Sequence, residues 1–323
     1  MVYSKLQNSL RRDSSIQRHT DLNFFALSSQ KKAKEPENID GLHPIDPDQP
    51  DQTSAGSRSP KRRGGEDLKN VLYEPEVFVV QPAEYQRAAK TLKIAFGKDE
   101  FVKYLTSPMQ SNLLLKEQVD EAFFEATVYL AILDGVVVAI RDEEGEKTDP
   151  ECPFLAVACF YKPESEPMSL TNYFYKMWKS GYLKFAWLAN QECRRRVFQE
   201  QWPLLNQAKS KVLGFREKNS WYLSDIGTTP QAQGKGCARK MLSYMYDNYI
   251  DPQSSFLYLE SSHPRNRKIY ERLGFTYIET IAVCNMVCDC LDECEVHEPK
   301  PLTMDLMVRG VRGGCWYDGE ISE

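Results

Sequence analysis

Hydrophobic positions predict alternating strands and helices from about residue 71 onward. Val77–Val80 is a short β-branched run ended by Pro82, which predicts a first strand. Residues 83–96 carry apolar side chains at roughly helical spacing, which predicts a helix. The same reasoning predicts the other elements of this half, which are a helix at 116–133, strands at 135–140 and 154–161, and an acidic hairpin-like loop at 142–149.

A helical, aromatic-rich stretch covers residues 170–215, and its aromatic side chains crowd the first half. Aromatic residues dominate buried area, so core or lid packing explains this cluster better than a ligand cage does. Beyond it the expected elements are strands at 221–228, 256–260 and 302–308, a helix after residue 237, and a short helix at 265–273. Strands and helices interleave throughout, which indicates the α/β (α+β) class.

Composition narrows the possible partners and compartment. The chain has 323 residues, a formal net charge of -5 and a sequence pI near 5.6, so no strongly basic domain indicates a nucleic-acid partner. No run of about 18 apolar residues predicts a membrane span, and residues 1–13 lack the apolar stretch of a signal peptide. Nine cysteines, several inside apolar runs, fit free thiols in a reducing compartment. We therefore expect a cytoplasmic protein.

The first 68 residues are expected to form a disordered polar tail. Residues 30–66 are dense in Pro, Ser, Gly, Asp and Lys, and such a segment cannot bury enough apolar surface to offset its ordering entropy. The basic run Ser59–Arg63 fits a solvated linker, with a nuclear import signal or a phosphorylation site as alternatives that leave a nuclear location open. The expected domain spans 69–311, with a helical insertion at about 168–215 and a C-terminal tail at 312–323.

A glycine-punctuated turn at 231–239 joins a strand to a helix. Exposed N–H groups and the helix dipole make such a turn an anion site, and side chains at Gly234 or Gly236 would keep a phosphate from the backbone. A P-loop would need Gly-Lys-Ser/Thr, but Lys235 is followed by Gly-Cys. A dinucleotide fingerprint would need a glycine where Arg239 stands. The pattern that remains is Gln-x-x-Gly-x-Ala, formed by Gln233, Gly236 and Ala238.

The segments after this turn match a known family in order. Leu259-Glu260-Ser-Ser ends a strand, Pro264-Arg-Asn266 opens a short helix, and Tyr270-Glu-Arg-Leu-Gly-Phe275 closes it. Together with the turn, this order resembles the GNAT acetyltransferase superfamily, and within it the puromycin N-acetyltransferases and their fungal relatives most of all. The first 70 or so residues and about the last 15 lie outside the resemblance. It implies a GNAT fold, in which a mixed central sheet with splayed middle strands is flanked by helices.

Carried over by position, the resemblance implies an acetyl-CoA site. Backbone groups of Ile226, Gly227 and Thr228 would pair with the pantetheine arm as an added β-strand does. Asn266 would contact the same arm of the cofactor. The pyrophosphate would lie against the amides of the turn, which are those of Gln233, Gly234, Lys235, Gly236, Cys237, Ala238 and Arg239.

The resemblance also implies that Tyr270 is the general acid for the departing thiolate. A phenol of pKa about 10 can protonate a thiolate whose conjugate acid has a pKa of about 8.5; packing beneath the sheet is the alternative role. Backbone N–H groups at 226–228 can donate to the oxyanion. Glu260 and Asp225 are the candidate bases, since either carboxylate can take a proton from an ammonium. Capping of the turn at 261–266 is the alternative role for Glu260.

The expected function is acetylation of a primary amine, on a small molecule or xenobiotic, by direct attack in a ternary complex. A protein lysine or N-terminal acetyltransferase is one alternative, and it would need an open groove where the insertion otherwise roofs a pocket. A non-catalytic acyl-CoA-binding regulator is the other. The cysteine run comprises Cys284, Cys288, Cys290 and Cys294 with His297 nearby, a set that could bind Zn²⁺. No metal site is expected, because no Cys-x-x-Cys spacing occurs and the cysteines fit small apolar core positions of a strand, but metal binding by this run stays open. The acceptor's identity, acyl length and oligomeric state stay open.

Overall fold

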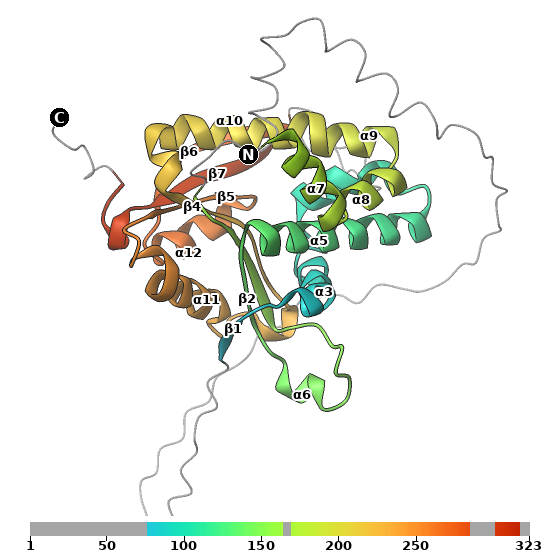
Figure 1. The fold of residues 1–323 in the computed structure, drawn as a ribbon, viewed down its shortest axis with the longest axis horizontal. Coiled ribbons are helices and arrows are strands. Elements are labelled where there is room, and N and C mark those ends of the chain that lie inside the picture. The colour runs from blue at the N-terminus through green and yellow to red at the C-terminus, as the bar shows by residue number, and fades with distance from the viewer. Residues whose placement is uncertain (1–75, 164–168, 285–300, 317–323) are drawn as a thin grey trace, which may run out of the picture. The chain divides into compact units, whose positions relative to one another are not determined.

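A seven-stranded mixed sheet forms the centre of the protein (Figure 1). The computed structural model describes residues 76–163, 169–284 and 301–316, so the polar tail expected at 1–68 lies outside the described residues. The strands are β1 Val77–Val79, β2 Gly135–Ile140, β3 Ala156–Tyr161, β4 Ser220–Thr228, β5 Phe256–Ser261, β6 Thr276–Cys284 and β7 Leu302–Arg309, in the order β1-β2-β3-β4-β5-β7-β6. Only the central pair β4–β5 is parallel; the other five pairs are antiparallel.

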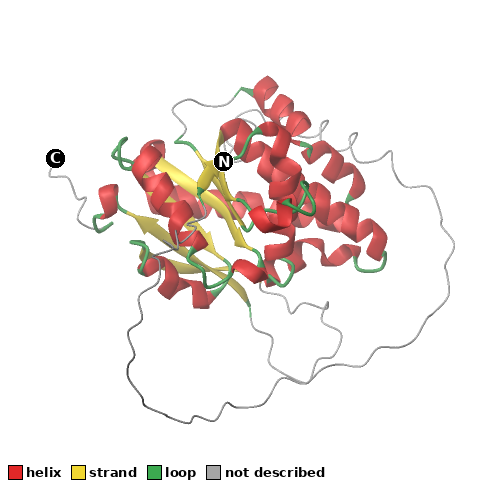
Figure 2. Ribbon diagram, turned by 90° about the horizontal axis from the view of Figure 1, so that it is seen from below, coloured by secondary structure: helices red, strands yellow, loops and turns green. Residues whose placement is uncertain are grey.

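Helices cover both faces of the sheet (Figure 2). They are α3 Tyr85–Ala95, α4 Glu100–Thr106, α5 Leu113–Asp134, α6 Glu143–Glu146, α7 Leu170–Ser180, α8 Tyr182–Leu188, α9 Gln191–Arg194, α10 Trp202–Leu213, α11 Cys237–Met245 and α12 Arg267–Glu271. The fold class expected from the sequence is thus confirmed. The pattern did not predict α4, which begins where the Asp99 carboxylate accepts a hydrogen bond from the Val102 amide at 3.0 Å.

The two faces of the sheet carry separate cores. On the α11 face, Trp221 and Leu223 of β4 pack with Met241 and Met245 of α11. On the opposite face, which we call the α5 face, Cys159 of β3 packs among residues of α3 and α5. Period-two alternation along each strand sends neighbouring side chains to opposite cores.

A β-bulge at Ser224 interrupts this alternation in β4. Phe160 pairs with Leu223, but the next residue of β3, Cys159, pairs with Asp225, so Ser224 is the extra residue. The bulge moves Asp225 and Gly227 to the α5 face and Ile226 to the α11 face. Without it, Asp225 would point into the apolar core with Leu223.

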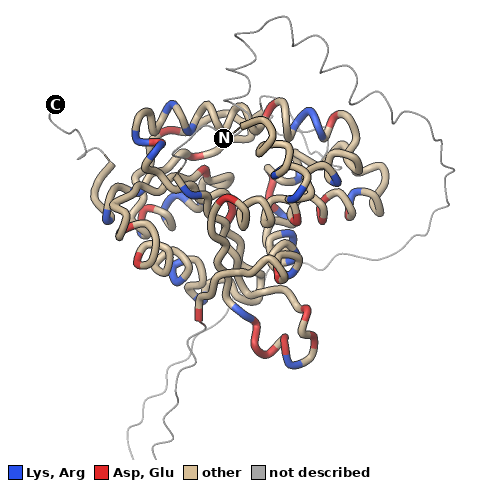
Figure 3. The backbone as a smooth tube through the Cα atoms, in the orientation of Figure 1, with Lys and Arg blue, Asp and Glu red and all other residues tan. Residues whose placement is uncertain are grey.

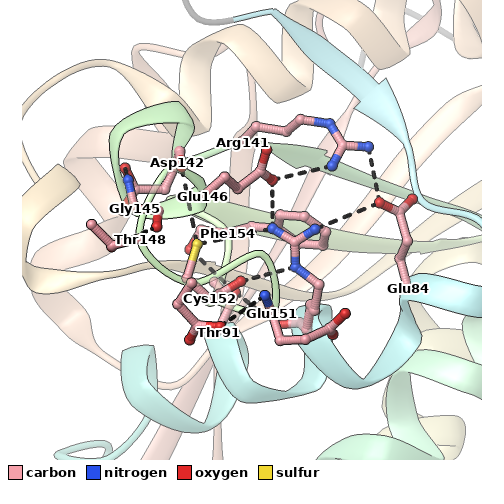
Figure 4. Close-up of polar contacts among 12 residues, drawn as sticks. Glu84, Thr91, Arg141, Asp142, Gly145, Glu146, Thr148, Glu151, Cys152 and Phe154 are labelled. Carbon is pink, nitrogen blue, oxygen red and sulfur yellow. Dashed lines mark hydrogen bonds and ion pairs between the residues drawn. The ribbon is translucent and has the colours of Figure 1, made fainter.

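Two arginines hold the acidic segment that connects β2 to β3 (Figure 4). The sequence predicted a hairpin-like loop at 142–149, and the structure has α6 there. Arg87 of α3 donates to the Glu146 carboxylate at 2.5 Å and to the Cys152 carbonyl at 2.9 Å, while Arg141 binds Glu84 at 2.9 Å. These contacts hold the segment that connects β2 to β3 in place. Its acidic residues are drawn in red in Figure 3.

The insertion between β3 and β4 is helical, as expected, and lies over the α5 face. Helices α7 and α8 pack on α5, and α10 packs on β5 and β7 through Ala208 and Leu213. Its aromatic cluster divides, since Tyr182 and Phe185 are buried, whereas Trp178 and Trp187 are exposed at 63% and 77%. Core packing therefore explains only part of the cluster.

The C-terminal strands close the sheet. A bulge between Ala282 and Cys284 of β6 gives these two residues different surroundings although they are two positions apart: Ala282 is exposed, and Cys284 packs beside the insertion. Beyond β7, Trp316 packs against the Phe256 ring with centroids 5.4 Å apart. Folded structure thus continues past residue 311 in the described part of the chain.

Candidate active site

The central strands β4 and β5 part midway along their length. Their parallel pairing runs from Ser220↔Phe256 to Leu223↔Leu259 and ends there, at the bulge. In the described residues, β4 beyond Leu223 is paired only to β3, and the end of β5 is paired only to β7. The edge of residues 226–228 that faces β5 therefore has backbone groups available to an extended ligand.

The predicted glycine turn lies directly beyond the open end of β4. Gly234 and Gly236 have φ of +76° and +79°, the left-handed region that other residues rarely adopt. A Cβ at either position would meet no heavy atom within 4 Å, so the backbone faces open space. Gly236 is the N-cap of α11, and the first N–H groups of a helix have no acceptor within it.

The side chains of the turn divide between inside and outside. Cys237 is buried and its Sγ contacts the Ala232 carbonyl oxygen at 3.7 Å, which fixes the start of α11 from below. Gln233, Lys235 and Arg239 are exposed. Two cationic side chains beside free N–H groups make the turn suited to a phosphate.

Tyr270 lies on α12, on the α11 face. Arg267 anchors the helix through a two-point ion pair with Asp305 of β7, at 2.7 and 2.9 Å. Gly274, with φ of +90°, ends the helical segment as the sequence predicted. Burial raises the pKa of Tyr270 above its usual range, and the carboxylate of Asp225 adds to the effect. The phenol is thus protonated at neutral pH and lies within the electrostatic reach of β4.

Glu260 lies on β5, one residue beyond its last pairing with β4, on the α5 face with Tyr258. Burial raises the pKa of Glu260 to about 7, against the opposing effects of the Tyr222 and Tyr258 phenols and the Lys209 ammonium. Its Oε1 atom is buried and has no hydrogen-bond partner. A carboxylate with this pKa exchanges protons readily near neutral pH.

Asp225 lies on β4 on the same face, opposite Cys159 of β3. Burial raises the pKa of Asp225 to about 6; the Asp99 carboxylate adds to this effect and the Ser224 hydroxyl opposes it. The bulge thus brings the two carboxylates considered from the sequence to one side of the parting strands.

The turn after β5 is held by residues other than Glu260. The Ser261 hydroxyl donates to the His263 carbonyl at 3.3 Å, and His263 Nδ1 accepts from the Arg265 amide at 3.1 Å. Ser262 donates to Asp99 at 2.6 Å, which ties this turn to α4. Asn266, half-buried, ends the short 3-10 turn Pro264–Asn266 before α12. Capping is therefore the role of His263.

Three residues near Glu260 were not identified from the sequence. Tyr222 stacks on Tyr161 with ring centroids 5.9 Å apart, and lies as close to Tyr258 on its other side. Lys209 of α10 is buried, with its Nζ 5.4 Å from the Tyr222 ring centroid and 3.3 Å from Glu217. The alternation of Tyr222 with Trp221 and Leu223 could have predicted which face of the sheet Tyr222 occupies. No local sequence pattern predicts that Lys209 lies near it.

Comparison with known proteins agrees with this geometry. A family described as acetyltransferase (GNAT) domain matches residues 205–278, from α10 into β6. An uncharacterised N-acetyltransferase of Schizosaccharomyces pombe is 33% identical over 205 residues, which cover 62% of this chain and 74% of the relative. The chain belongs to the GNAT family of N-acetyltransferases. The resemblance stated from the motifs of residues 221–275 is confirmed at the level of this family.

Solved structures similar to this acetyltransferase are more distant. A protein of Corynebacterium glutamicum described as a histone acetyltransferase and related acetyltransferase is 18% identical, with a TM-score of 0.41 over 73% of this chain and 96% of that one. Arylalkylamine N-acetyltransferase 2 of Aedes aegypti is 13% identical, with a TM-score of 0.44 over 73% and 98%. Neither likeness bears on the acceptor of this acetyltransferase.

The described residues also bear on two other expectations. No group of three or more His, Cys, Asp or Glu side chains in them is placed to hold a metal ion. Cys288, Cys290, Cys294 and His297 fall in 285–300, outside the described residues. None of the helices that the structure describes is long and apolar enough to cross a membrane.

Proposed function

We propose that this acetyltransferase transfers the acetyl group of acetyl-CoA to a primary amine of a small molecule, by direct attack in a ternary complex. The parting of β4 and β5 after Leu223 carries the proposal. It leaves a free strand edge beside the glycine turn, with Glu260 and Asp225 on one side of the sheet and Tyr270 on the other.

Acetyl-CoA would bind along β4 and over the start of α11. The pantetheine arm would pair with backbone groups of residues 226–228, and the pyrophosphate would lie against the amides of residues 233–239. Open space above Gly234 and Gly236 is consistent with this fit. Asn266, at the entry to α12, would donate to the arm from the other side.

The transfer would use the groups on the two sides in turn. Glu260 takes a proton from the ammonium, the neutral nitrogen attacks the thioester carbon, and a backbone N–H of residues 226–228 stabilises the oxyanion. The carbon–sulfur bond then breaks, and Tyr270 protonates the departing thiolate. The second proton that the nitrogen loses as it becomes an amide passes, directly or through water, to the Tyr270 phenolate and restores the phenol. Glu260 suits the base because burial raises the pKa of this carboxyl to about 7, close to the working pH.

The insertion favours a small acceptor over a protein. Helix α10 covers the α5 face at Tyr258, and Lys209 reaches the Tyr222 ring beneath it. Tyr182 of α8 is buried and within electrostatic reach of Asp225. Helix α10 thus covers the sheet on the side of Glu260, which favours a small acceptor over a polypeptide. The likeness of residues 221–275 to the puromycin N-acetyltransferases supports the same acceptor class.

Release of the CoA thiol from acetyl-CoA, measured with a panel of small primary amines and a lysine-containing peptide, tests the proposal. We expect turnover with small amines and a loss of about 10²–10⁴ in kcat for Tyr270→Phe, with acetyl-CoA binding retained. Tyr249→Phe, which removes a phenol from the same face outside the parting strands, is the matched control. Acetyl-CoA binding without turnover for any amine would instead favour a regulator, and preference for the peptide would refute the small acceptor.

A further inference from the structure

A side-chain hydrogen bond links the two segments that lie beyond the parting of β4 and β5. The Ser262 hydroxyl, in the turn directly after β5, donates to the Asp99 carboxylate at 2.6 Å. The two residues are 163 positions apart in the sequence, so only the fold brings them together. Asp99 lies between α3 and α4, and the hydrogen bond therefore ties the end of β5 to the helices of the α5 face.

The Asp99 end of this contact is anchored on β4. The last turn of α3 lies against the open part of β4, since a Cβ at Gly227 would lie 2.8 Å from the Ala95 Cβ and 3.5 Å from Phe96 Cε2. The Asp99 amide donates to the Phe96 carbonyl at 2.9 Å, which fixes Asp99 just beyond that turn. The hydrogen bond thus runs from a segment packed on β4 to the turn that follows β5, on the face where Glu260 lies.

Both oxygen atoms of the Asp99 carboxylate accept hydrogen bonds, and they do so from different parts of the chain. Oδ1 accepts from the Val102 amide at 3.0 Å and caps α4, whereas Oδ2 accepts from Ser262. The helix thus holds the carboxylate in the orientation that the Ser262 hydroxyl requires. Hydrogen bonds to ionised acceptors are shorter and stronger than those between neutral groups. This contact is therefore suited to keep the two segments at a fixed separation.

The position of the turn after β5 matters for the proposed base. Glu260 lies two residues before Ser262, and in the described residues β5 beyond Leu259 is paired only to β7. The hydrogen bonds of Ser261 and His263 stay within the turn and do not hold it toward β4. Of these three neighbours, Ser262 is the one that binds the helices packed on β4.

We propose that Asp99 and Ser262 are positioning residues that set the width of the acceptor site between the parted strands. Their hydrogen bond holds Glu260 at the separation from β4 at which it takes the proton of an amine that faces the thioester. A misplacement of about 1 Å in such an arrangement can cost on the order of 10²-fold in rate. Both residues act through Glu260 and not on the reacting atoms. This inference rests on the proposed transfer to a small amine and adds what limits the size of that amine.

Ser262→Ala tests this inference with the amines of the panel that the wild-type enzyme acetylates. Without the hydroxyl, the turn after β5 can move away from β4. We expect kcat/KM to fall about tenfold for the smallest amine and less than about threefold for the bulkiest, so that selectivity, the ratio of the two values, decreases. The dissociation constant of acetyl-CoA should stay within about twofold, because the glycine turn does not depend on this contact.

The outcomes separate this inference from the proposed function. An equal fall in kcat/KM for both amines, or no fall at all, would overturn the inference alone, because general loosening of the fold does not change selectivity. A wild-type enzyme that acetylates no amine would overturn the proposed function and the inference with it.

Three further variants assign the effect to this hydrogen bond. Ser255→Ala is the matched control and should keep the wild-type selectivity, since it removes a hydroxyl that donates to Asn219 at 2.9 Å at the paired end of the same two strands. Ser262→Thr retains the hydroxyl and should retain selectivity. Asp99→Ala, added to Ser262→Ala, should lower selectivity no further, because the contact is already lost. A further loss in the double variant would overturn the pairing of Asp99 with Ser262.

Discussion

The two sides of the candidate site are built in different ways. The glycine turn before α11 offers backbone N–H groups, positive φ angles and open space, and all of its residues lie within a single stretch at 231–239. The α5 side offers side chains brought together from β3, β4, β5, α8 and α10. Glu260 and Lys209, for example, are far apart in the sequence but within electrostatic reach in the fold.

This difference separates a candidate site built from backbone conformation from one built from side chains. A phosphate bound by backbone groups depends on conformation more than on residue identity, so glycines suffice. An acceptor bound by side chains depends on each residue's charge and burial. We expect substitutions on the two sides to change different properties of the enzyme, and the following five predictions test that expectation.

Glu260→Gln should cause the largest loss. Without a base, kcat/KM for the amine should fall by about 10²–10⁴, whereas the affinity for acetyl-CoA should change little. The wild-type rate should fall as pH drops below 7, because the pKa of Glu260 is about 7, and the variant should lack that dependence. Steady-state kinetics between pH 5.5 and 9, with the exposed Glu144→Gln as control, measures both effects.

Stability distinguishes a lost base from a misfolded enzyme. Folding raises the pKa of Glu260, so the folded state holds this proton more tightly than the unfolded chain does. The Glu260 contribution to the free energy of unfolding therefore decreases as pH rises from the ordinary value, near 4.5, through about 7. Glu260→Gln should be at least as stable as wild type at pH 8, and a lower melting temperature there would contradict this account.

Gly236→Val should act on the other side alone. A β-branched residue at φ +79° costs about 1–2 kcal/mol, and its side chain would occupy the space expected for the phosphate. KM for acetyl-CoA should rise about 10- to 100-fold, with a smaller change in kcat at saturation. Gly214→Val, at φ +53° with equally open surroundings, is the matched control. If both variants raised KM equally, general strain rather than cofactor binding would explain the effect.

Gly227→Ala should affect both the glycine-turn side and the α5 side of the candidate site, because Gly227 lies on β4, which borders both. A Cβ there would lie 2.8 Å from the Ala95 Cβ and 3.0 Å from Leu92 Cδ2, so α3 would have to move away from β4. We expect a loss of about 1–3 kcal/mol in the free energy of unfolding, measured by urea denaturation. Gly97→Ala, whose added Cβ meets ordinary contacts at 3.5 Å, should be close to neutral.

Lys209→Met should have the smallest effect, confined to the α5 side. The ammonium lowers the pKa of Glu260, so its removal should move the acid limb of the pH profile to higher pH. At pH 7 the rate should fall only about twofold, since part of the carboxylate stays ionised. Lys211→Met, an exposed change on the same helix, should leave the profile in place. A shift to lower pH would have the wrong sign for this assignment.

The order of strands, turn and helices at 221–275 was predictable because each of these signals is local. The left-handed glycines, the strand runs and the closing Gly274 depend on residues a few positions apart. The predicted strand at 302–308 and the helical insertion were found for the same reason. The helix α6 within residues 142–149 and helix α4 were harder to predict, because short helices show little hydrophobic periodicity.

Tertiary structure alone decided how the site is assembled. Strict alternation would have buried Asp225 with Leu223, and only the pairing of β4 with β3 creates the bulge that turns it to the α5 face. Likewise, only the packing of α10 on the sheet brings Lys209 to Tyr222. The sequence by itself thus determined the glycine turn that we propose as the cofactor site, because its signals lie within one stretch of chain. The proposed acceptor site depends on contacts between distant segments, which no local pattern records.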